Sequence, residues 1–195
     1  GNCTAFNTNM NNGTASLFDR TDEGIYIDDV KLSTTGDIPG IWKGTVSTDW
    51  FDCKNWYYSK VPTATTDVTI DQTAVNLCVI DAAGSAVCRN INISSNNTAS
   101  SSLTIQNASS LISGGNTIIS KSAGSGICKL ELLGTNSSFT CNSITLNGTS
   151  SGAGNAQFLN EYHLNTATIN GTITINSGGR LDLNSASDYG IINLK

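Results

Sequence analysis

Short stretches of alternating apolar and polar residues recur along the second half of the chain. In "INGTITINSGGRLDL" (169–183), isolated Ile and Leu residues alternate with Thr, Asn, Ser and Gly. Alternation over four to eight residues predicts β-strands, because successive side chains point to opposite faces of a strand. The pattern places Ile173 and Ile175 inside and Thr172 and Thr174 outside. No segment shows the helical period, so the pattern predicts an all-β fold.

The alternating stretches also repeat. The segment "SLTIQNASSLISGGNTIIS" (102–120) aligns with "KLELLGTNSSFTCNSITLN" (129–147), and equivalent positions 23 to 28 residues apart are Leu77, Leu103, Leu130, Phe158 and Leu181. Each unit holds about three short strands, which is typical of one coil of a β-solenoid whose coils stack at ~4.8 Å and share interior columns. We therefore predict a parallel β-helix of about 4–5 coils of ~26 residues, with an aromatic N-terminal cap and a short preceding β segment.

Three regions of the chain differ in composition. We predict a partial jelly-roll-like β segment at 1–38, a Trp-rich solenoid cap at 39–75 and the β-solenoid at 76–195. The chain is 38% hydrophobic and 13% charged. Such a composition is compatible with disorder, but the many Ile, Val and Thr residues favour β structure.

Charge and hydropathy exclude several partners. The net charge of −5 provides no basic face for nucleic acid. No stretch approaches the ~18 apolar residues of a membrane span. Because the chain begins at Gly1 without a charged and apolar leader, we expect a mature or excised protein.

The six cysteines are even in number and widely spaced, without the C-x₂-C pairs of a zinc site. Disulfides in an oxidising compartment fit this pattern, and free buried thiols are the alternative. Cys88 and Cys141 occupy equivalent positions two coils apart, which is ~9.6 Å and too far for a direct bond. We therefore predict pairing within coils: Cys78–Cys88 and Cys128–Cys141, leaving Cys3–Cys53.

Asparagines recur with the coil period. Asn90, Asn116 and Asn142 lie 26 residues apart. Stacked amides at one corner would bond to each other as a ladder, and separate surface-loop asparagines are the alternative.

A Trp-rich segment, "GIWKGTVSTDWFDCKNWYYSKVPTATTDVTI" (40–70), precedes the repeats. It resembles the W-x-G-x(4)-D-W-x(4)-N-W segment, followed by V-P and D-V-x-I, that opens secreted right-handed β-helix modules of large Bacteroidetes surface and adhesin proteins. The matching residues are Trp42, Gly44, Asp49, Trp50, Asn55, Trp56, Val61, Pro62, Asp67, Val68 and Ile70. The resemblance implies a cap over the first coil, and Cys53 departs from it, which supports a bridge particular to this protein.

The aromatic residues of this segment suggest a ligand site. Trp50, Trp56, Tyr57 and Tyr58 are candidates for a sugar-stacking platform, because aromatic faces pack well on pyranose rings. The alternative is that they form the core of the cap, which needs a large apolar area from few residues.

The segment "DRTDEGIYIDDVKLS" (19–33) resembles the closing strand of jelly-roll modules such as carbohydrate-binding and adhesin-type sandwiches. The resemblance implies a structural calcium ion held by Asp28, and Asp22 and Glu23 supply further oxygen donors. A solvated acidic turn is the alternative, because the spacing matches no EF-hand loop.

Polysaccharide lyases and glycoside hydrolases also use β-helices, and a pair of facing carboxylates would indicate such an enzyme. "KLEL" (129–132) and "RLDL" (180–183) are in register and place Glu131 and Asp182 on one outer face, ~9.6 Å apart. Cross-strand charge pairs on a solvated sheet explain this pattern as well. His163 lies near no nucleophile motif, so a structural role is expected. We expect no catalytic residues and no cofactor other than a structural calcium ion.

These observations favour a noncatalytic extracellular structural or adhesion module of a larger secreted bacterial protein. Its location would be extracellular or at the cell surface, and its partners glycans or other extracellular proteins, without nucleic acid or a membrane span. The alternatives are a carbohydrate-binding module attached to a polysaccharide-degrading enzyme, or a β-helix lyase or glycosidase fragment. Because "GIINLK" (190–195) is strand-like without a polar cap, we also expect an exposed last coil.

Overall fold

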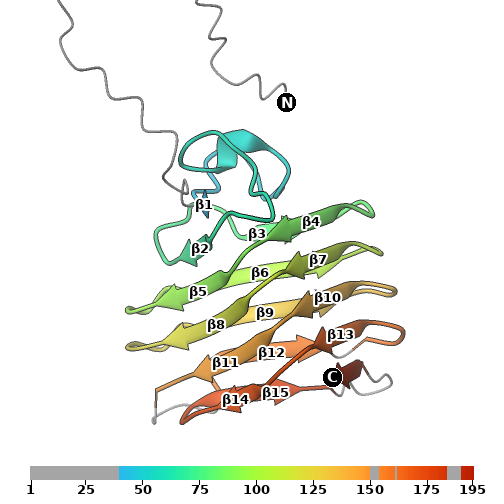
Figure 1. The fold of residues 1–195 in the computed structure, drawn as a ribbon. Helices are drawn as coiled ribbons and strands as arrows, with labels where there is room; N and C mark the ends of the chain where they lie inside the picture. Colours follow the sequence, from blue (N-terminus) through green and yellow to red (C-terminus); the bar gives the residue numbers. More distant parts are fainter. Residues whose placement is uncertain (1–39, 150–153, 161, 184–189) are drawn as a thin grey trace, which may run out of the picture.

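The computed structural model describes residues 40–149, 154–160, 162–183 and 190–195. These residues form an all-β parallel solenoid of five coils below a Trp-rich cap (Figure 1). The predicted fold class is therefore confirmed. The predicted jelly-roll-like segment (1–38), with the calcium candidates Asp22, Glu23 and Asp28, lies outside the described residues.

Each coil contributes one strand to each of three parallel sheets. The first sheet consists of β1 (Gly40–Ile41), β2 (Val68–Asp71), β5 (Ile91–Ser95), β8 (Asn116–Lys121), β11 (Ser143–Asn147) and β14 (Ile173–Ile175). The second consists of β3 (Cys78–Ile80), β6 (Ser101–Gln106), β9 (Cys128–Leu133), β12 (Ala156–Asn160) and β15 (Gly179–Asp182). The third consists of β4 (Ser85–Cys88), β7 (Ser110–Ser113), β10 (Ser138–Cys141), β13 (Thr166–Ile169) and β16 (Ile191–Leu194).

Continuous columns of apolar side chains fill the interior. In the second sheet, the register stacks Cys78, Leu103, Leu130, Phe158 and Leu181. Four of these five are the positions expected from the repeat. The first expected position, Leu77, is one residue early: it precedes β3 and is 53% exposed, while Cys78 points inward. A coil that could not bury its few apolar residues alone does so against its neighbours.

The last described coil carries its apolar side chains in register but leaves several of them exposed. Ile173 and Ile175 stack below Ile144 and Leu146, and the predicted interior position is confirmed for Ile173, which packs against the core, but not for Ile175. Ile173 is half-buried, while Ile175, Ile191 and Leu194 are exposed. Unlike inner coils, these strands have a paired neighbour on one side only. The expected exposed last coil therefore holds for its described residues.

Two predicted disulfides are wrong, because Cys78, Cys88, Cys128 and Cys141 are free and buried. Cys78 begins β3 and Cys88 ends β4, so each thiol faces inward from a different sheet as a member of a separate column. Cys128 and Cys141 are divided between β9 and β10 in the same way. Each thiol acts as a small apolar side chain. The predicted Cys3–Cys53 bridge is not tested, because Cys3 lies outside the described residues.

Candidate functional site

Three tryptophans form the core of the cap. Trp42 and Trp50 each pack edge-to-face on Trp56, at centroid distances of 5.0 and 4.8 Å. All three are buried. The indole nitrogens of Trp42 and Trp56 donate to the carbonyl oxygens of Asn76 (2.8 Å) and Trp50 (2.7 Å). The cluster therefore closes the upper end of the solenoid, as the cap-core interpretation predicted.

A buried asparagine holds the cap loop around this cluster. Asn55 Oδ1 accepts hydrogen bonds from the backbone nitrogens of Val46 (2.9 Å) and Ser47 (3.0 Å). Its Nδ2 donates to Ser47 Oγ and to the carbonyl oxygen of Asp49, both at 2.9 Å. One amide therefore satisfies two donors and two acceptors, which explains physically why the motif has Asn at this position.

Of the four aromatic residues expected to bind sugar, two are buried and two are exposed. Trp50 and Trp56 are buried in the cap and present no face to solvent. Tyr57 and Tyr58 are exposed and form a T-shaped pair at 4.6 Å, with Lys43 Nζ 5.1 Å from the Tyr57 ring centroid. A ligand role thus remains a prediction only for the two tyrosines.

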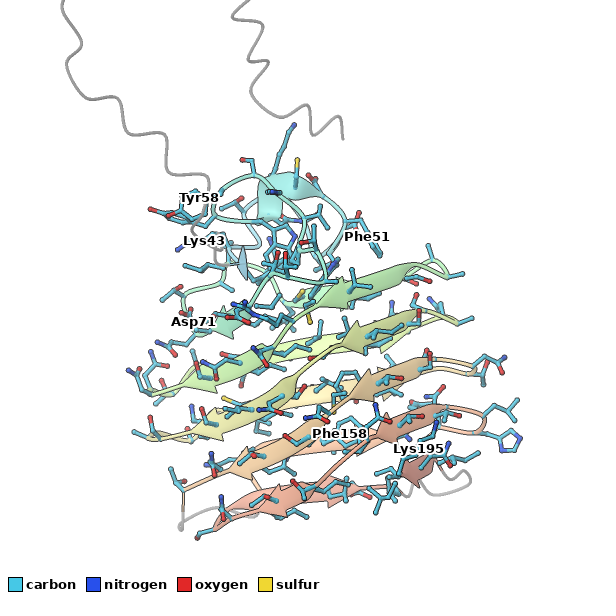
Figure 2. The ribbon with its side chains drawn as sticks, viewed as in Figure 1. Lys43, Phe51, Tyr58, Asp71, Phe158 and Lys195 are labelled. Carbon is cyan, nitrogen blue, oxygen red and sulfur yellow. The ribbon has the colours of Figure 1, made fainter. Side chains whose placement is uncertain are left out.

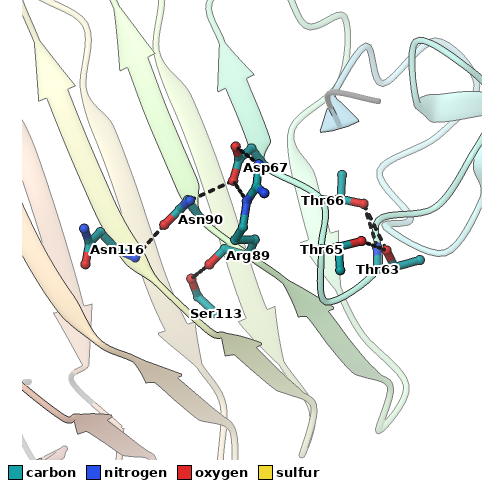
Figure 3. Close-up of polar contacts among 8 residues, drawn as sticks. All are labelled: Thr63, Thr65, Thr66, Asp67, Arg89, Asn90, Ser113 and Asn116. Carbon is teal, nitrogen blue, oxygen red and sulfur yellow. Dashed lines mark hydrogen bonds and ion pairs between the residues drawn. The ribbon is translucent and has the colours of Figure 1, made fainter. Parts of the chain in front are cut away.

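A polar ladder runs along one corner of the coils (Figure 3). Asn90 Nδ2 donates to Asp67 Oδ1 (2.7 Å), and Asn90 Oδ1 accepts from the Asn116 backbone nitrogen (2.8 Å). Ser143 Oγ continues the ladder by donating to Asn116 Oδ1 (2.8 Å). Asn90 and Asn116 therefore stack at one corner, but the predicted bonding of side-chain amides to each other is wrong: the Asn90 amide bonds to the Asn116 backbone, and the Asn116 amide bonds to a serine hydroxyl. Asn142 falls one position outside it, because Ser143 pairs with Asn116 in the strand register.

The ladder ends in an ion pair beneath the cap. Arg89 Nε donates to Asp67 Oδ1 at 2.7 Å, and its Nη2 lies 2.5 Å from Oδ2. The side-chain hydrogen bond from Arg89 is the largest effect and lowers the pKa of Asp67, burial opposes it, and the hydrogen bond from Asn90 lowers the pKa further. An open groove of about 370 Å³ lies over this face, lined by Asp67, Thr69, Asn92, Ile118 and their neighbours.

A second groove lies where the cap meets the first coils, and we call it the cap groove. It measures about 480 Å³. Its described lining residues are Thr48, Asp49, Phe51, Val79, Asp81, Ala82, Gly84 and Gln106. Sequence reasoning did not identify this site, because no pattern links three segments that are brought together only by coil stacking.

The two carboxylates expected to align on an outer face do so. Glu131 and Asp182 both pair in register with Leu159, one coil above and one coil below it. Each carboxylate has a basic partner in its own strand: Lys129 Nζ lies 2.7 Å from Glu131 Oε2, and Arg180 contacts Asp182. The charge pairs lie within strands and not across them, so the structural alternative is correct in pairing these charges but wrong about which residues pair.

A lysine is buried at another corner. Lys121 is 2% exposed, and its ammonium group donates to Ser95 Oγ (2.8 Å) and to the carbonyl oxygens of Ala99 (3.1 Å) and Asn97. It reaches from the third coil to the loop between β5 and β6 in the second. Since a buried ammonium requires hydrogen-bond acceptors, Lys121 ties these two coils together.

Other candidate chemistry is sparse in the described part of the chain. Burial raises the pKa of Cys88 and Cys141 to about 12 and that of Cys128 to about 11, and also raises that of Cys78. These thiols therefore stay protonated at neutral pH. His163 is exposed in the turn before β13. Among residues the structure describes, no three or more His, Cys, Asp or Glu gather as a metal site, and no helix is long and apolar enough to span a membrane.

Among known proteins, a family model matches one part of the chain. A family model described as "Domain of unknown function (DUF8693)" matches residues 41–129, from the cap into the third coil. No curated protein and no solved structure matches the chain. The matched region contains the Trp cluster and the cap groove, but the family description names no activity.

Proposed function

We propose that this chain is a noncatalytic structural and attachment module of a larger extracellular bacterial protein. The observation that carries the proposal is the set of interior columns shared by successive coils. Stacked coils of this kind extend a fold in one dimension, since each coil is stabilised by its immediate neighbours. A stalk or surface-attachment segment requires such rigid length.

The outer faces of the coils suit weak, repeated contacts. In the third sheet the outward positions of four successive strands are uncharged: Ser85, Val87, Ser110, Ile112, Ser138, Thr140, Thr166 and Thr168. Hydroxyl groups on such a face exchange hydrogen bonds with glycans or neighbouring proteins. Each contact is weak, but many aligned contacts together provide attachment.

The extracellular location rests on the resemblance of the Trp-rich segment to secreted β-helix modules. The cysteines give it less support than their number suggested, because four of them are free thiols. An oxidising compartment would act on the remaining two, Cys3 and Cys53.

A carbohydrate-binding module is the second candidate function. The specific observation in its favour is the exposed Tyr57–Tyr58 pair, which offers aromatic surface at the cap. A lyase or glycosidase is the third, and it would depend on the aligned Glu131 and Asp182.

Incubation of the protein with plant, algal and host polysaccharides tests the noncatalytic part of the proposal. We expect neither new reducing ends nor unsaturated products. Product release that disappears in a Glu131→Gln/Asp182→Asn double variant would overturn the proposal in favour of an enzyme. A surface attachment assay on the same polysaccharides and on host glycoproteins tests the other part, and retention on none of them would contradict it.

A further inference from the structure

The cap groove contains an aromatic ring in a defined position. Phe51 is 37% exposed and lies on the opposite side of the cap from Tyr58 (Figure 2). Its ring covers the backbone of Gly84: a Cβ added to Gly84 would lie 2.3 Å from Phe51 Cε2. Only glycine allows the ring this close. The part of the ring not covered by Gly84 is therefore available to the groove.

Fixed polar groups surround this ring. Asp81 Oδ2 accepts from Gln106 Nε2 (2.8 Å), and its Oδ1 accepts from Asn107 Nδ2 (2.7 Å) and from the backbone nitrogen of Ala82 (2.5 Å). These hydrogen bonds, with that from Gln106 the largest effect, lower the pKa of Asp81 and keep it a carboxylate. The carboxylate is held by residues of two coils and is thus preorganised.

A second carboxylate is tied to the ring itself. Asp49 Oδ1 accepts from the Phe51 backbone nitrogen at 2.8 Å, which fixes the aromatic residue relative to the carboxylate. The backbone on either side is held by the first coil: Trp50 N donates to the Val79 carbonyl oxygen (2.9 Å), and Val79 N donates to that of Thr48 (2.8 Å). The described lining residues thus include two carboxylates and an amide, and they include no cation.

We propose that the cap groove is a binding site for a neutral saccharide. The ring of Phe51 packs on the apolar C–H face of a pyranose, while Asp49 and Asp81 accept hydrogen bonds from its hydroxyl groups. The two carboxylates repel uronic or sulfated sugars, so the ligand class is neutral. The inference rests on the proposed attachment function and names a site and a ligand class for it.

Calorimetric titration of the full chain tests the site. The probes are short oligosaccharides of glucose, galactose, mannose and xylose, with oligogalacturonate as the acidic comparator. We expect at least one neutral probe to bind and oligogalacturonate not to bind. Phe51→Ala should weaken binding roughly tenfold or more, because the loss of an aromatic contact is worth about that factor.

Further variants distinguish an effect on the Phe51 ring from a general effect on the fold of the cap. Gly84→Ala keeps Phe51 but forces its ring to move, and it should weaken binding as Phe51→Ala does. Tyr58→Ala tests the rival site, because Tyr57 and Tyr58 are the other exposed aromatic candidates and lie on the other side of the cap from Phe51. Leu164→Ala is the control: it removes an exposed apolar side chain from the turn before β13, outside the cap, and should leave affinity unchanged. Tryptophan fluorescence of each variant verifies that the buried cluster is intact.

The proposal is overturned if no neutral probe binds, if oligogalacturonate binds as well as the neutral probes, or if binding is lost in Tyr58→Ala and kept in Phe51→Ala. These outcomes are distinguishable from failure of the proposed function. Product release from polysaccharides would contradict the noncatalytic role whether or not Phe51 matters, and attachment to glycoproteins without oligosaccharide binding would refute only the groove.

Discussion

Truncation of one interior side chain should show how strongly the coils depend on each other. Leu130 is fully buried in the third coil, and the register places Leu103 above it and Phe158 below it. Leu181 belongs to the same column in the last described coil, where it is only partly buried. Leu130→Ala and Leu181→Ala therefore remove the same atoms from an enclosed and an open position.

The expected costs differ for a physical reason. Removal of three buried carbon groups costs about 2.4 kcal/mol of transfer free energy at ~0.8 kcal/mol each. Ladder hydrogen bonds fix the spacing between the Leu130 strand and the strands above and below it. The cavity left by Leu130→Ala therefore cannot collapse, and the total cost in unfolding free energy rises to about 4 kcal/mol. Around Leu181 less area is lost and the space opens to one side, so about 1–2 kcal/mol is expected.

Guanidinium unfolding of both variants measures the difference. Fluorescence of the three buried tryptophans follows the cap, and far-UV circular dichroism follows the sheets. Both probes should show Leu130→Ala to be the more destabilising by about 2 kcal/mol. A Leu130→Ala cost equal to or below that of Leu181→Ala would refute the reasoning, because the column would then contribute no enclosed core.

Other contacts give further expectations. Asn55→Ala removes the four hydrogen bonds of a buried side chain and should cost about 2–4 kcal/mol with a red shift of tryptophan emission; unchanged emission would contradict its role in the cap. Lys121→Met should lower the free energy of unfolding by about 1–3 kcal/mol, because the lost hydrogen bonds of the ammonium group outweigh the removed cost of burying its charge. A variant more stable than the original protein would contradict this expectation. Arg89 lowers the pKa of Asp67 in the folded state. The Asp67–Arg89 pair therefore stabilises the fold above the ordinary carboxyl pKa, and this stabilisation is lost as pH falls through the lowered pKa. Asp67→Asn should therefore destabilise near neutral pH and progressively less in acid unfolding; a pH-independent difference would contradict the linkage. The four free thiols should resist a maleimide until the protein unfolds, as mass spectrometry would show, and rapid native labelling would disprove their burial.

The candidate site was predictable only in part. The motif around Trp50 and Asn55 indicated a cap, because closing a solenoid needs large side chains and satisfied loop amides in few residues. The cap groove was not predictable. Phe51, Asp81 and Gln106 come from different segments, and only the stacking of cap on coil brings them together.

The alternation and the repeat were sufficient to determine the parallel coils, the direction of their side chains and most of the column through Leu103 and Leu130. These features depend on residues close in sequence and on a constant period. Tertiary structure alone decided that Cys78 replaces Leu77 in that column and that the four described thiols are free. The physical reason is that a shift of one residue reverses the direction of a side chain on a strand. Which coil corners meet, and at what distance, is not contained in the periodicity of any one coil.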